Sequence, residues 1–167
     1  MTPAEQQAID EFRRLRGTDP FGPFIALLKS PELLTRVSAL GEYLRYRSAL
    51  PPRLSEFVIL ITASHWQQQY EWEVHAPIAL KAGVAQATLD ALAAGRTPEG
   101  LNEDEAALYD FCRGVHAGGR LAEGVRARAA AAVGEQGVVD AIGICGYYAM
   151  LAMVLNVENG PPAPTGK

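Results

Sequence analysis

The sequence predicts an all-α protein, and two features carry this prediction. Apolar residues recur every three or four positions through most of the 167-residue chain, which is the period of helices that bury one face. Glycine and proline residues separate these segments, and no stretch alternates apolar and polar residues as a half-exposed strand does. The predicted architecture is a bundle of about seven to eight helices.

The first two long helices are each expected to begin at a proline. Thr2-Pro-Ala-Glu5 forms a capping box with proline at the first helical position, and the segment from Gly17 to Pro23 ends that helix. Ser30 and Pro31 open the next helix in the same manner. Its apolar side consists of Leu33, Leu34, Val37, Leu40 and Leu44.

Two helices are predicted in the middle of the chain. Pro51 and Pro52 start a helix over about 53–68, and a second helix runs from about Tyr70 to Ala82. Gly83 is a typical C-terminal cap for the second helix. A short helix over 86–93 then precedes a loop from 95 to 100.

The last third of the chain is also expected to be helical. Asn102 caps a helix that the glycine pair at 118 and 119 ends, and an alanine-rich helix over 122–133 follows. The closing helix spans the apolar segment from Val138 to Val157. These helices form one predicted domain over residues 1–159, with a flexible tail rich in proline and glycine at 160–167.

Composition places the chain among soluble globular proteins. Lys and Arg number 15 against 19 Asp and Glu, so the formal charge is −4 and the chain lacks the basic face that nucleic-acid binding requires. The polar start has no apolar signal segment, so a cytoplasmic location is expected. The segment from Val138 to Val157 approaches the length of a membrane span. Its internal glycines and tyrosines and its acidic flanks favour instead a helix buried in the core or at a subunit interface.

The candidate active site is built from Glu56, Glu71 and His75. Glu71 and His75 lie four residues apart, so their side chains share one face of a helix and can meet. Glu56 precedes His75 by nineteen residues, on the preceding predicted helix. Two carboxylates and an imidazole brought together can transfer protons. Each residue alone also has a structural interpretation, His75 as a hydrogen-bonded core histidine and Glu56 as a solvent-exposed side chain.

The other residues that could do chemistry are expected to be structural. His65 and His116 are assigned to packing. Cys112 and Cys145 stand far apart without the spacing of a zinc site or a disulfide framework. They are expected on other helices, where only a coincidence of folding would let them substitute for a Cys-x-x-Cys. Carboxylate-bridged metal centres use Glu-x-x-His twice, whereas the spacing here is Glu-x-x-x-His and occurs once. No metal and no cofactor are predicted.

A set of motifs spread along the chain points to a known family. The motifs are Leu50-Pro51, Glu56, Glu71-Trp72, His75, Ala79, Gly83, Asp104-Glu105, Tyr109-Asp110, Gly146-Tyr147-Tyr148 and Leu155-Asn156. Their order resembles the carboxymuconolactone decarboxylase family, whose superfamily includes the alkylhydroperoxidase AhpD-like proteins. The resemblance covers residues 24–162 and implies an AhpD-like helical bundle, here with an N-terminal extension of two helices. It also implies a homo-oligomer, a trimer or a hexamer, that acts on a small molecule.

The resemblance separates two branches of that superfamily. The AhpD-like peroxidases carry a redox Cys-x-x-Cys, and alignment through Glu56 and His75 puts Gln68 and Glu71 at the two cysteine positions. Peroxidase chemistry of that type needs both thiols and is therefore excluded. The decarboxylase branch carries a Glu four residues before the His, as this chain does. That likeness implies cofactor-independent acid–base chemistry on a small carboxylated lactone or a related conjugated carbonyl compound.

The resemblance to the decarboxylase branch also implies roles for the three candidate residues. His75 is the expected acid or proton shuttle, oriented by Glu71, and Glu56 is a second base or tunes the imidazole by its charge. The implied activity is that of a carbon–carbon lyase in the catabolism of aromatic compounds, within a Glu-Trp-x-x-His subgroup. Two alternatives stay open: an AhpD-like peroxidase, disfavoured because Cys-x-x-Cys is absent, and a non-catalytic ligand-binding oligomer.

Substrate contacts are expected from residues near these three. Any of Arg45, Arg47 and Arg53 could clamp an anionic group, and each could equally be a surface charge. Trp72 adds aromatic bulk beside Glu71, and one of the tyrosines at 147 and 148 is expected to reach the pocket with its hydroxyl. The predicted substrate-binding residues are Arg45, Arg53, Trp72 and Tyr147.

Overall fold

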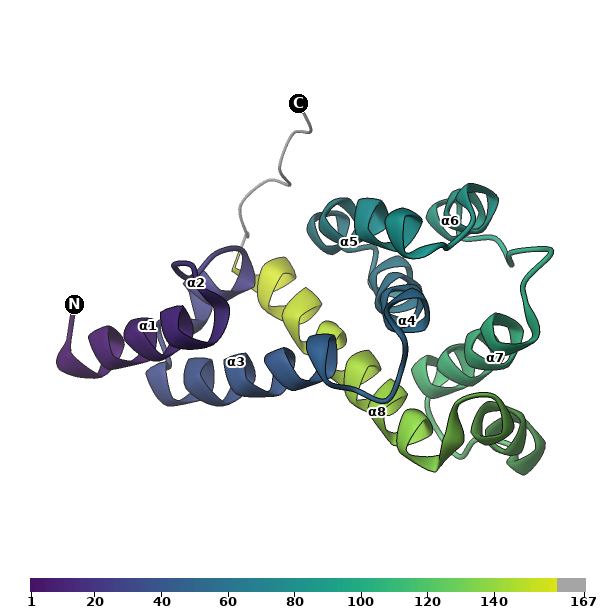
Figure 1. The fold of residues 1–167 in the computed structure, drawn as a ribbon. Coiled ribbons are helices and arrows are strands. Elements are labelled where there is room, and N and C mark those ends of the chain that lie inside the picture. The colour runs from purple at the N-terminus through teal and green to yellow at the C-terminus, as the bar shows by residue number, and fades with distance from the viewer. Residues whose placement is uncertain (159–167) are drawn as a thin grey trace.

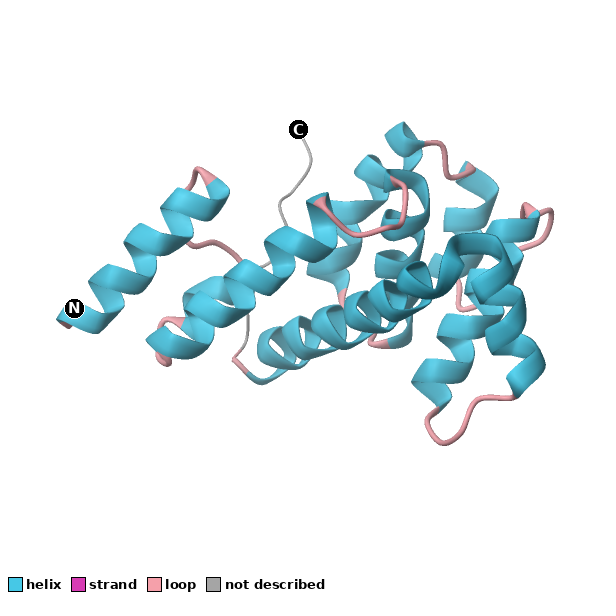
Figure 2. Ribbon diagram, turned by 60° about the horizontal axis from the view of Figure 1, so that its bottom comes forward, coloured by secondary structure: helices cyan, strands magenta, loops and turns pink. Residues whose placement is uncertain are grey.

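The computed structural model describes residues 1–158, and within them it consists of helices and connecting loops (Figure 1 and Figure 2). The all-α prediction is confirmed, and this part of the chain contains eight helices. Their bounds are α1 Pro3–Arg16, α2 Pro23–Leu27, α3 Pro31–Tyr46, α4 Pro52–His65, α5 Gln69–Ala82, α6 Gln86–Ala93, α7 Glu103–Ala117 and α8 Glu123–Val157. The tail predicted over 160–167 lies outside the described residues.

Local capping explains where several helices begin and end. The Thr2 hydroxyl accepts a hydrogen bond from the Glu5 amide at 3.2 Å, and the Glu5 carboxylate accepts one from the Thr2 amide at 2.6 Å, which completes the capping box of α1. α5 ends at Gly83, whose φ of 104° lies in the left-handed region that glycine adopts without strain. Both boundaries depend on sequence neighbours, so both were predictable.

Two boundaries differ from the sequence prediction. The segment Pro23–Leu27, expected at the edge of a break, forms the short helix α2, which packs against α3 and α8. The alanine-rich and apolar segments, expected as separate helices, are contiguous within α8 and are divided only by a kink. α8 bends at Gly134, where φ is 75° and ψ is 168°, so the two predicted helices meet at one glycine without a loop between them.

α4 is the centre of the fold and the helix from which the candidate site is built. Every residue from 54 to 63 is buried, because α5, α7 and α8 all pack against α4 (Figure 1). A helix that is apolar around its whole circumference is stable only when it is enclosed in this way. α5 packs closely on α4, and α1 packs on α3 at the other end of the molecule (Figure 1).

α8 contributes to the core and also presents an uncovered apolar face. Among the described residues it is the one helix long and apolar enough to cross a membrane, and 56% of that segment is buried within the protein. Core helices of soluble proteins meet the same criterion, so the finding by itself is weak evidence for a membrane span. The exposed side of α8 holds the large apolar residues Val139, Ile142, Met153 and Val157.

Candidate active site

The structure brings Glu56, Glu71 and His75 together. Glu56 Oε2 lies 2.7 Å from His75 Nδ1, and Glu71 Oε2 lies 3.6 Å from His75 Nε2. The imidazole therefore lies between two carboxyl groups, with a hydrogen bond to Glu56 and a longer approach to Glu71. The exposed fractions of Glu56, Glu71 and His75 are 4%, 4% and 2%, so bulk water is largely excluded from this cluster.

The packing of α5 on α4 creates this arrangement. Glu71 and His75 are one turn apart on α5, and both are buried on the side of α5 that meets α4. Glu56 belongs to the fully enclosed part of α4, so its carboxylate cannot turn to solvent. A buried carboxylate is tolerated only with a hydrogen-bond partner, and His75 is that partner.

The pKa shifts favour a neutral imidazole beside a carboxyl group that titrates near pH 7. Burial lowers the pKa of His75, and the hydrogen bond to Glu56 opposes this shift. Burial raises the pKa of Glu71 to about 7, whereas the charge of Arg45 acts to lower it. When neutral His75 donates Nδ1–H to the Glu56 carboxylate, the lone pair of Nε2 faces Glu71. A proton can then move between Glu71 and Nε2 of His75.

Two tyrosines of α8 form a wall of the site. The Tyr148 ring meets the His75 ring in a T-shaped contact with the ring centroids 5.0 Å apart, and the Tyr147 ring lies 5.3 Å from that of Tyr148. Burial raises the pKa of Tyr147 to about 12 and also raises the pKa of Tyr148, so both hydroxyls stay protonated at neutral pH. Tyr148 therefore packs on the imidazole, and Tyr147 adds a second hydroxyl.

Arg45 and Arg16 bring positive charge to this cluster. Arg45 is half-buried on α3, and its charge lowers the pKa values of Glu71, His75 and Tyr147. Arg16 Nη2 donates to the Tyr147 hydroxyl at 3.4 Å, and the buried Nε of Arg16 has no hydrogen-bond partner among the described residues. Within residues 1–158 neither arginine forms an ion pair with a carboxylate. Two such cations can hold an anionic ligand.

Arg16 was missed by the sequence analysis because its contact with Tyr147 spans 131 residues of sequence. The close approach of these two side chains depends on Gly41 of α3. A Cβ added at Gly41 would overlap the Tyr147 hydroxyl and lie 2.5 Å from Arg16 Nη2. Gly41, a glycine inside a helical pattern, is therefore the sequence signal for this contact, since such a glycine often marks the close approach of another group.

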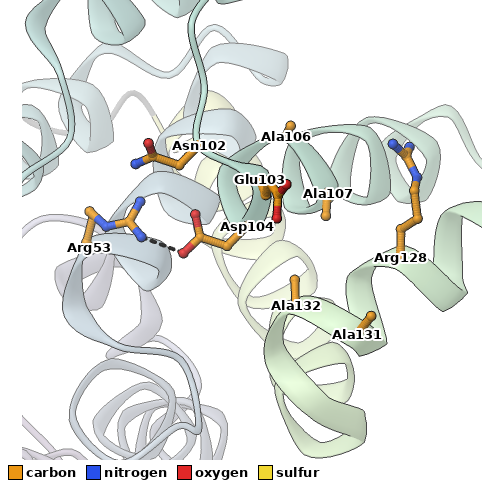
Figure 3. A pocket seen from close by; sticks show the side chains of 9 residues that line it. All are labelled: Arg53, Asn102, Glu103, Asp104, Ala106, Ala107, Arg128, Ala131 and Ala132. Atoms are coloured by element: carbon orange, nitrogen blue, oxygen red, sulfur yellow. Dashed lines mark hydrogen bonds and ion pairs between the residues drawn. The ribbon is translucent and has the colours of Figure 1, made fainter.

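Arg53 and Arg47, which were expected as possible anion clamps, are each already paired with carboxylates of the protein. Arg53 donates to Asp104 and Glu105 in the first turn of α7, and Figure 3 shows its guanidinium directed toward Asp104. Two carboxylates thus compensate the charge of Arg53 already. Arg47 is likewise paired, with Glu42. The cavity beside Arg53, of about 830 Å³, is lined by α7 and the start of α8 and contains none of the triad residues (Figure 3).

Trp72 follows Glu71 on α5. One residue along a helix turns the side chain by about 100°, so Trp72 leaves the face that holds Glu71. Trp72 lines a separate cavity of about 380 Å³, together with Gln68 and Leu92. The role of Trp72 as a substrate contact stays a prediction.

Cys112 and Cys145 lie on two separate helices, α7 and α8, as predicted, and both are buried free thiols. α7 and α8 pack against each other, and the two thiols interact across that contact. His116, one turn beyond Cys112 on α7, also reaches Cys145.

Within residues 1–158 no group of three or more His, Cys, Asp or Glu side chains is arranged to hold a metal ion. The candidate site consists of proton donors and acceptors: two carboxyl groups, an imidazole, two tyrosine hydroxyls and two guanidinium groups. Such a set can bind an anion and move a proton.

Comparison with known proteins gives a family and a fold. Residues 31–110 match the model of the carboxymuconolactone decarboxylase family. No curated protein matches the sequence significantly. Among solved structures, the debrominase Bmp8 in its apo form has a TM-score of 0.71 and 17% sequence identity, over 95% of this chain and 86% of that chain. A cysteine-to-alanine variant of Bmp8 in complex with 2,3,4-tribromopyrrole has a TM-score of 0.73 and 16% identity, over 97% and 87%.

At these identities the likeness to Bmp8 concerns the fold alone, and that fold is the AhpD-like helical arrangement expected from the motifs. The family match includes Glu56, Glu71 and His75, since all three fall within residues 31–110. Residues 31–110 of this chain thus resemble the carboxymuconolactone decarboxylase family, and the fold is that of its AhpD-like structural neighbours.

Proposed function

We propose that this protein is a cofactor-independent acid–base enzyme that removes CO₂ from a small carboxylated lactone or a related conjugated carbonyl compound. The observation that carries the proposal is the His75 imidazole held between Glu56 and Glu71. The charge of Arg45 acts on Glu71 and His75, and Arg16 donates to the Tyr147 hydroxyl at the edge of the site; neither arginine has a carboxylate partner among the described residues. The family match supports chemistry of the decarboxylase type.

The two arginines would bind the substrate carboxylate or a neighbouring anionic group. When the carbon–carbon bond to the carboxylate breaks, its electron pair delocalises into the conjugated carbonyl, and the resulting enolate must gain a proton on carbon. Glu71, whose pKa is about 7, can hold that proton at neutral pH, and Nε2 of His75 can receive and return it. Glu56 keeps the imidazole in one tautomer by accepting from Nδ1.

The exclusion of water supports this assignment. Charges interact more strongly in a site that is shielded from solvent. An enolate in such a site gains its proton from a group of the site and not from bulk water. Because the triad is at most 4% exposed, a substrate can enter only when covering side chains move. Arg16 and Tyr147 are part of this cover, since they close over Gly41 of α3.

The uncovered apolar face of α8 supports self-association. Val139, Ile142 and Met153 are 62%, 47% and 45% exposed, and a stripe of this kind is commonly buried by another subunit. We therefore expect a homo-oligomer, as the family resemblance implies, in the cytoplasm and acting in the catabolism of aromatic compounds. Size-exclusion chromatography with light scattering would measure the number of subunits.

The test of the proposed function is a substrate panel assayed for CO₂ release and for loss of the conjugated chromophore. The panel contains carboxylated unsaturated lactones, the same lactones as methyl esters, and 2,3,4-tribromopyrrole, the compound bound to the similar structure. Turnover is expected for the free carboxylates and not for the esters, because the ester removes both the leaving group and the anion. Turnover of the bromopyrrole alone would overturn the proposal.

Two variants link this turnover to the triad. His75→Gln and Glu71→Gln each replace a proton-transferring group by a neutral amide, and each is expected to lower kcat by about a hundredfold or more. Glu73→Gln is the matched control, since Glu73 is on the same helix and bonds to Gln69 instead. Equal loss in all three variants, or none in the first two, would remove the triad from the mechanism.

A further inference from the structure

A cavity outside the triad lies between the C-terminal ends of α4 and α6 and the first turn of α5, and the proposed function does not use it. It is the cavity of about 380 Å³ that Trp72 lines, and this volume is typical of sites that bind small molecules. Ala63 and Leu92 give it a buried apolar lining, and the half-buried Trp72 adds an indole ring. A flat apolar ring therefore fits part of this space.

The polar part of this cavity is formed by uncharged groups. None of the side chains that line it carries a formal charge, whereas the charge of Arg45 acts on the triad. Its polar groups come from Ser64 and from three consecutive glutamines at 67–69. A charged ligand would lose its hydration here without gaining an opposite charge, so this lining favours an uncharged ligand.

Gln67 has a backbone conformation that normally belongs to glycine. Its φ is 50°, and within residues 1–158 it is the one residue other than glycine with a positive φ. The amide of Gln67 donates to the Ser64 carbonyl at 3.1 Å, and the amide of Gln68 donates to the Ala63 carbonyl at 2.9 Å. These two bonds form a Schellman motif at the end of α4, in which Gln67 takes the left-handed position.

Two other helices end with the same motif, and both use glycine. The left-handed residue is Gly83 after α5 and Gly95 after α6, and the same two backbone hydrogen bonds are present at each. A side chain at this position strains the backbone, which glycine avoids. Strained residues of this kind are concentrated at ligand sites. Gln67 lines the cavity, so the structure points to a role for its side chain there.

The side chain of Gln67 is also the glutamine amide that the protein leaves without a partner. Gln68 Nε2 donates to Asn156 Oδ1 at 2.6 Å, and its Oε1 accepts from the backbone of α5. Gln69 Nε2 donates to Glu73 at 2.7 Å. Within residues 1–158 the side-chain amide of Gln67 forms no hydrogen bond, so its N–H and C=O groups are both open to a ligand.

We infer that this cavity binds an uncharged planar heterocycle in which an N–H group lies next to a C=O group, as in a cyclic amide. The Gln67 amide would form two parallel hydrogen bonds with that edge, as glutamine does with the donor and acceptor of adenine. The ring would pack on the indole of Trp72 and on the apolar lining. This site contains no triad residue, so the inference does not depend on the proposed function.

The test titrates 2-pyridone, a small cyclic amide, into the full-length protein and follows its amide NMR spectrum. Saturable shifts are expected for the side-chain amide of Gln67 and the indole N–H of Trp72. N-methyl-2-pyridone keeps the ring but lacks the N–H donor, so it should bind about tenfold more weakly. Equal affinity for the two compounds, tighter binding of benzoate, or shifts confined to His75 and Tyr148 would overturn the inference.

Variants separate ligand binding from stability. Gln67→Gly removes the amide and relieves the left-handed strain, so it should raise Tm and weaken 2-pyridone binding by about tenfold or more. Trp72→Leu should also weaken binding by about tenfold, the scale of aromatic stacking. Gln86→Ala is the matched control, since Gln86 bonds to Asp90 outside the cavity, and it should bind 2-pyridone like the wild type. A higher Tm with unchanged affinity in Gln67→Gly would show that the glutamine has no role in binding, and the inference would be wrong.

Discussion

Glu56 Oε2 lies 2.7 Å from His75 Nδ1, and the side chains of both residues are almost wholly buried. This contact joins α4 to α5, so it serves both the fold and the candidate chemistry. Glu56→Ala removes the acceptor and leaves a buried N–H without a partner, which costs about 1–3 kcal/mol. We expect a lower free energy of unfolding by urea denaturation, and loss of turnover with the substrate found in the panel.

Glu73→Ala is the control for that prediction. Glu73 is on the same helix as His75 and bonds only to Gln69, so its free energy of unfolding should change by no more than about 0.5 kcal/mol. If Glu56→Ala were as stable as Glu73→Ala, the buried contact with His75 would not stabilise the fold.

The raised pKa of Glu71 predicts how stability depends on pH. The native protein keeps the Glu71 proton up to about pH 7, whereas the unfolded chain releases it near its ordinary value of 4.5. The native state therefore binds more protons in this interval, and stability falls as pH rises from about 4.5 to 7. Glu71→Gln cannot titrate, so relative to the wild type it should gain about 3 kcal/mol on going from pH 4 to pH 8.

Urea denaturation of both proteins across this pH range measures the difference. His75 contributes with the opposite sign, because its lowered pKa means that stability is lost as pH falls below about 6.5. That contribution is present in both proteins and largely cancels in the comparison. Parallel stability curves for the wild type and Glu71→Gln would show that Glu71 is ionised in the native protein at pH 5 to 7.

Local signals explain why much of the fold could be predicted. The capping box at Thr2 and Glu5 and the glycine cap at Gly83 act between near neighbours, so the sequence carries them directly. Glu71 and His75 were also linked locally, by one helical turn. The helix Pro23–Leu27, which follows the predicted break from Gly17 to Pro23, is not predicted because five residues are too few to show helical periodicity.

The remaining site residues depend on tertiary packing. Arg16 reaches Tyr147 only because α1 packs on α3 and Gly41 leaves room, and nothing within either segment encodes that distance. The direction of Arg53 is likewise decided by Asp104 and Glu105 on another helix. The helical period predicts on which face of its helix a residue lies. It does not predict which side chain of another helix binds that residue.

Gly41→Ala tests the packing at the edge of the site. The added Cβ would overlap the Tyr147 hydroxyl and press on Arg16, so both side chains must move. Overpacking of this kind typically costs about 1–3 kcal/mol, which outweighs the gain in helix propensity. Gly124→Ala is the matched control, since a Cβ there meets nothing within 4 Å and the change should be neutral or stabilising. Thermal unfolding of the two variants should therefore shift in opposite directions or at least differ clearly, and equal shifts would contradict the close contact.

Replacing Arg53 by methionine is expected to change mainly the stability, whereas replacing Arg45 by methionine is expected to change mainly KM. Arg53 binds two carboxylates of α7, so Arg53→Met should lower the free energy of unfolding by about 1–3 kcal/mol and leave KM nearly unchanged. Arg45 has no carboxylate partner among residues 1–158 and acts on Glu71 and His75, so Arg45→Met should raise KM for the carboxylated substrate by about tenfold with a smaller effect on stability. Steady-state kinetics and urea denaturation of both variants separate the two roles. A rise in KM for Arg53→Met equal to that for Arg45→Met would mean that Arg53 leaves α7 to bind the substrate, and the anion would then be held from α4 as well as from α3.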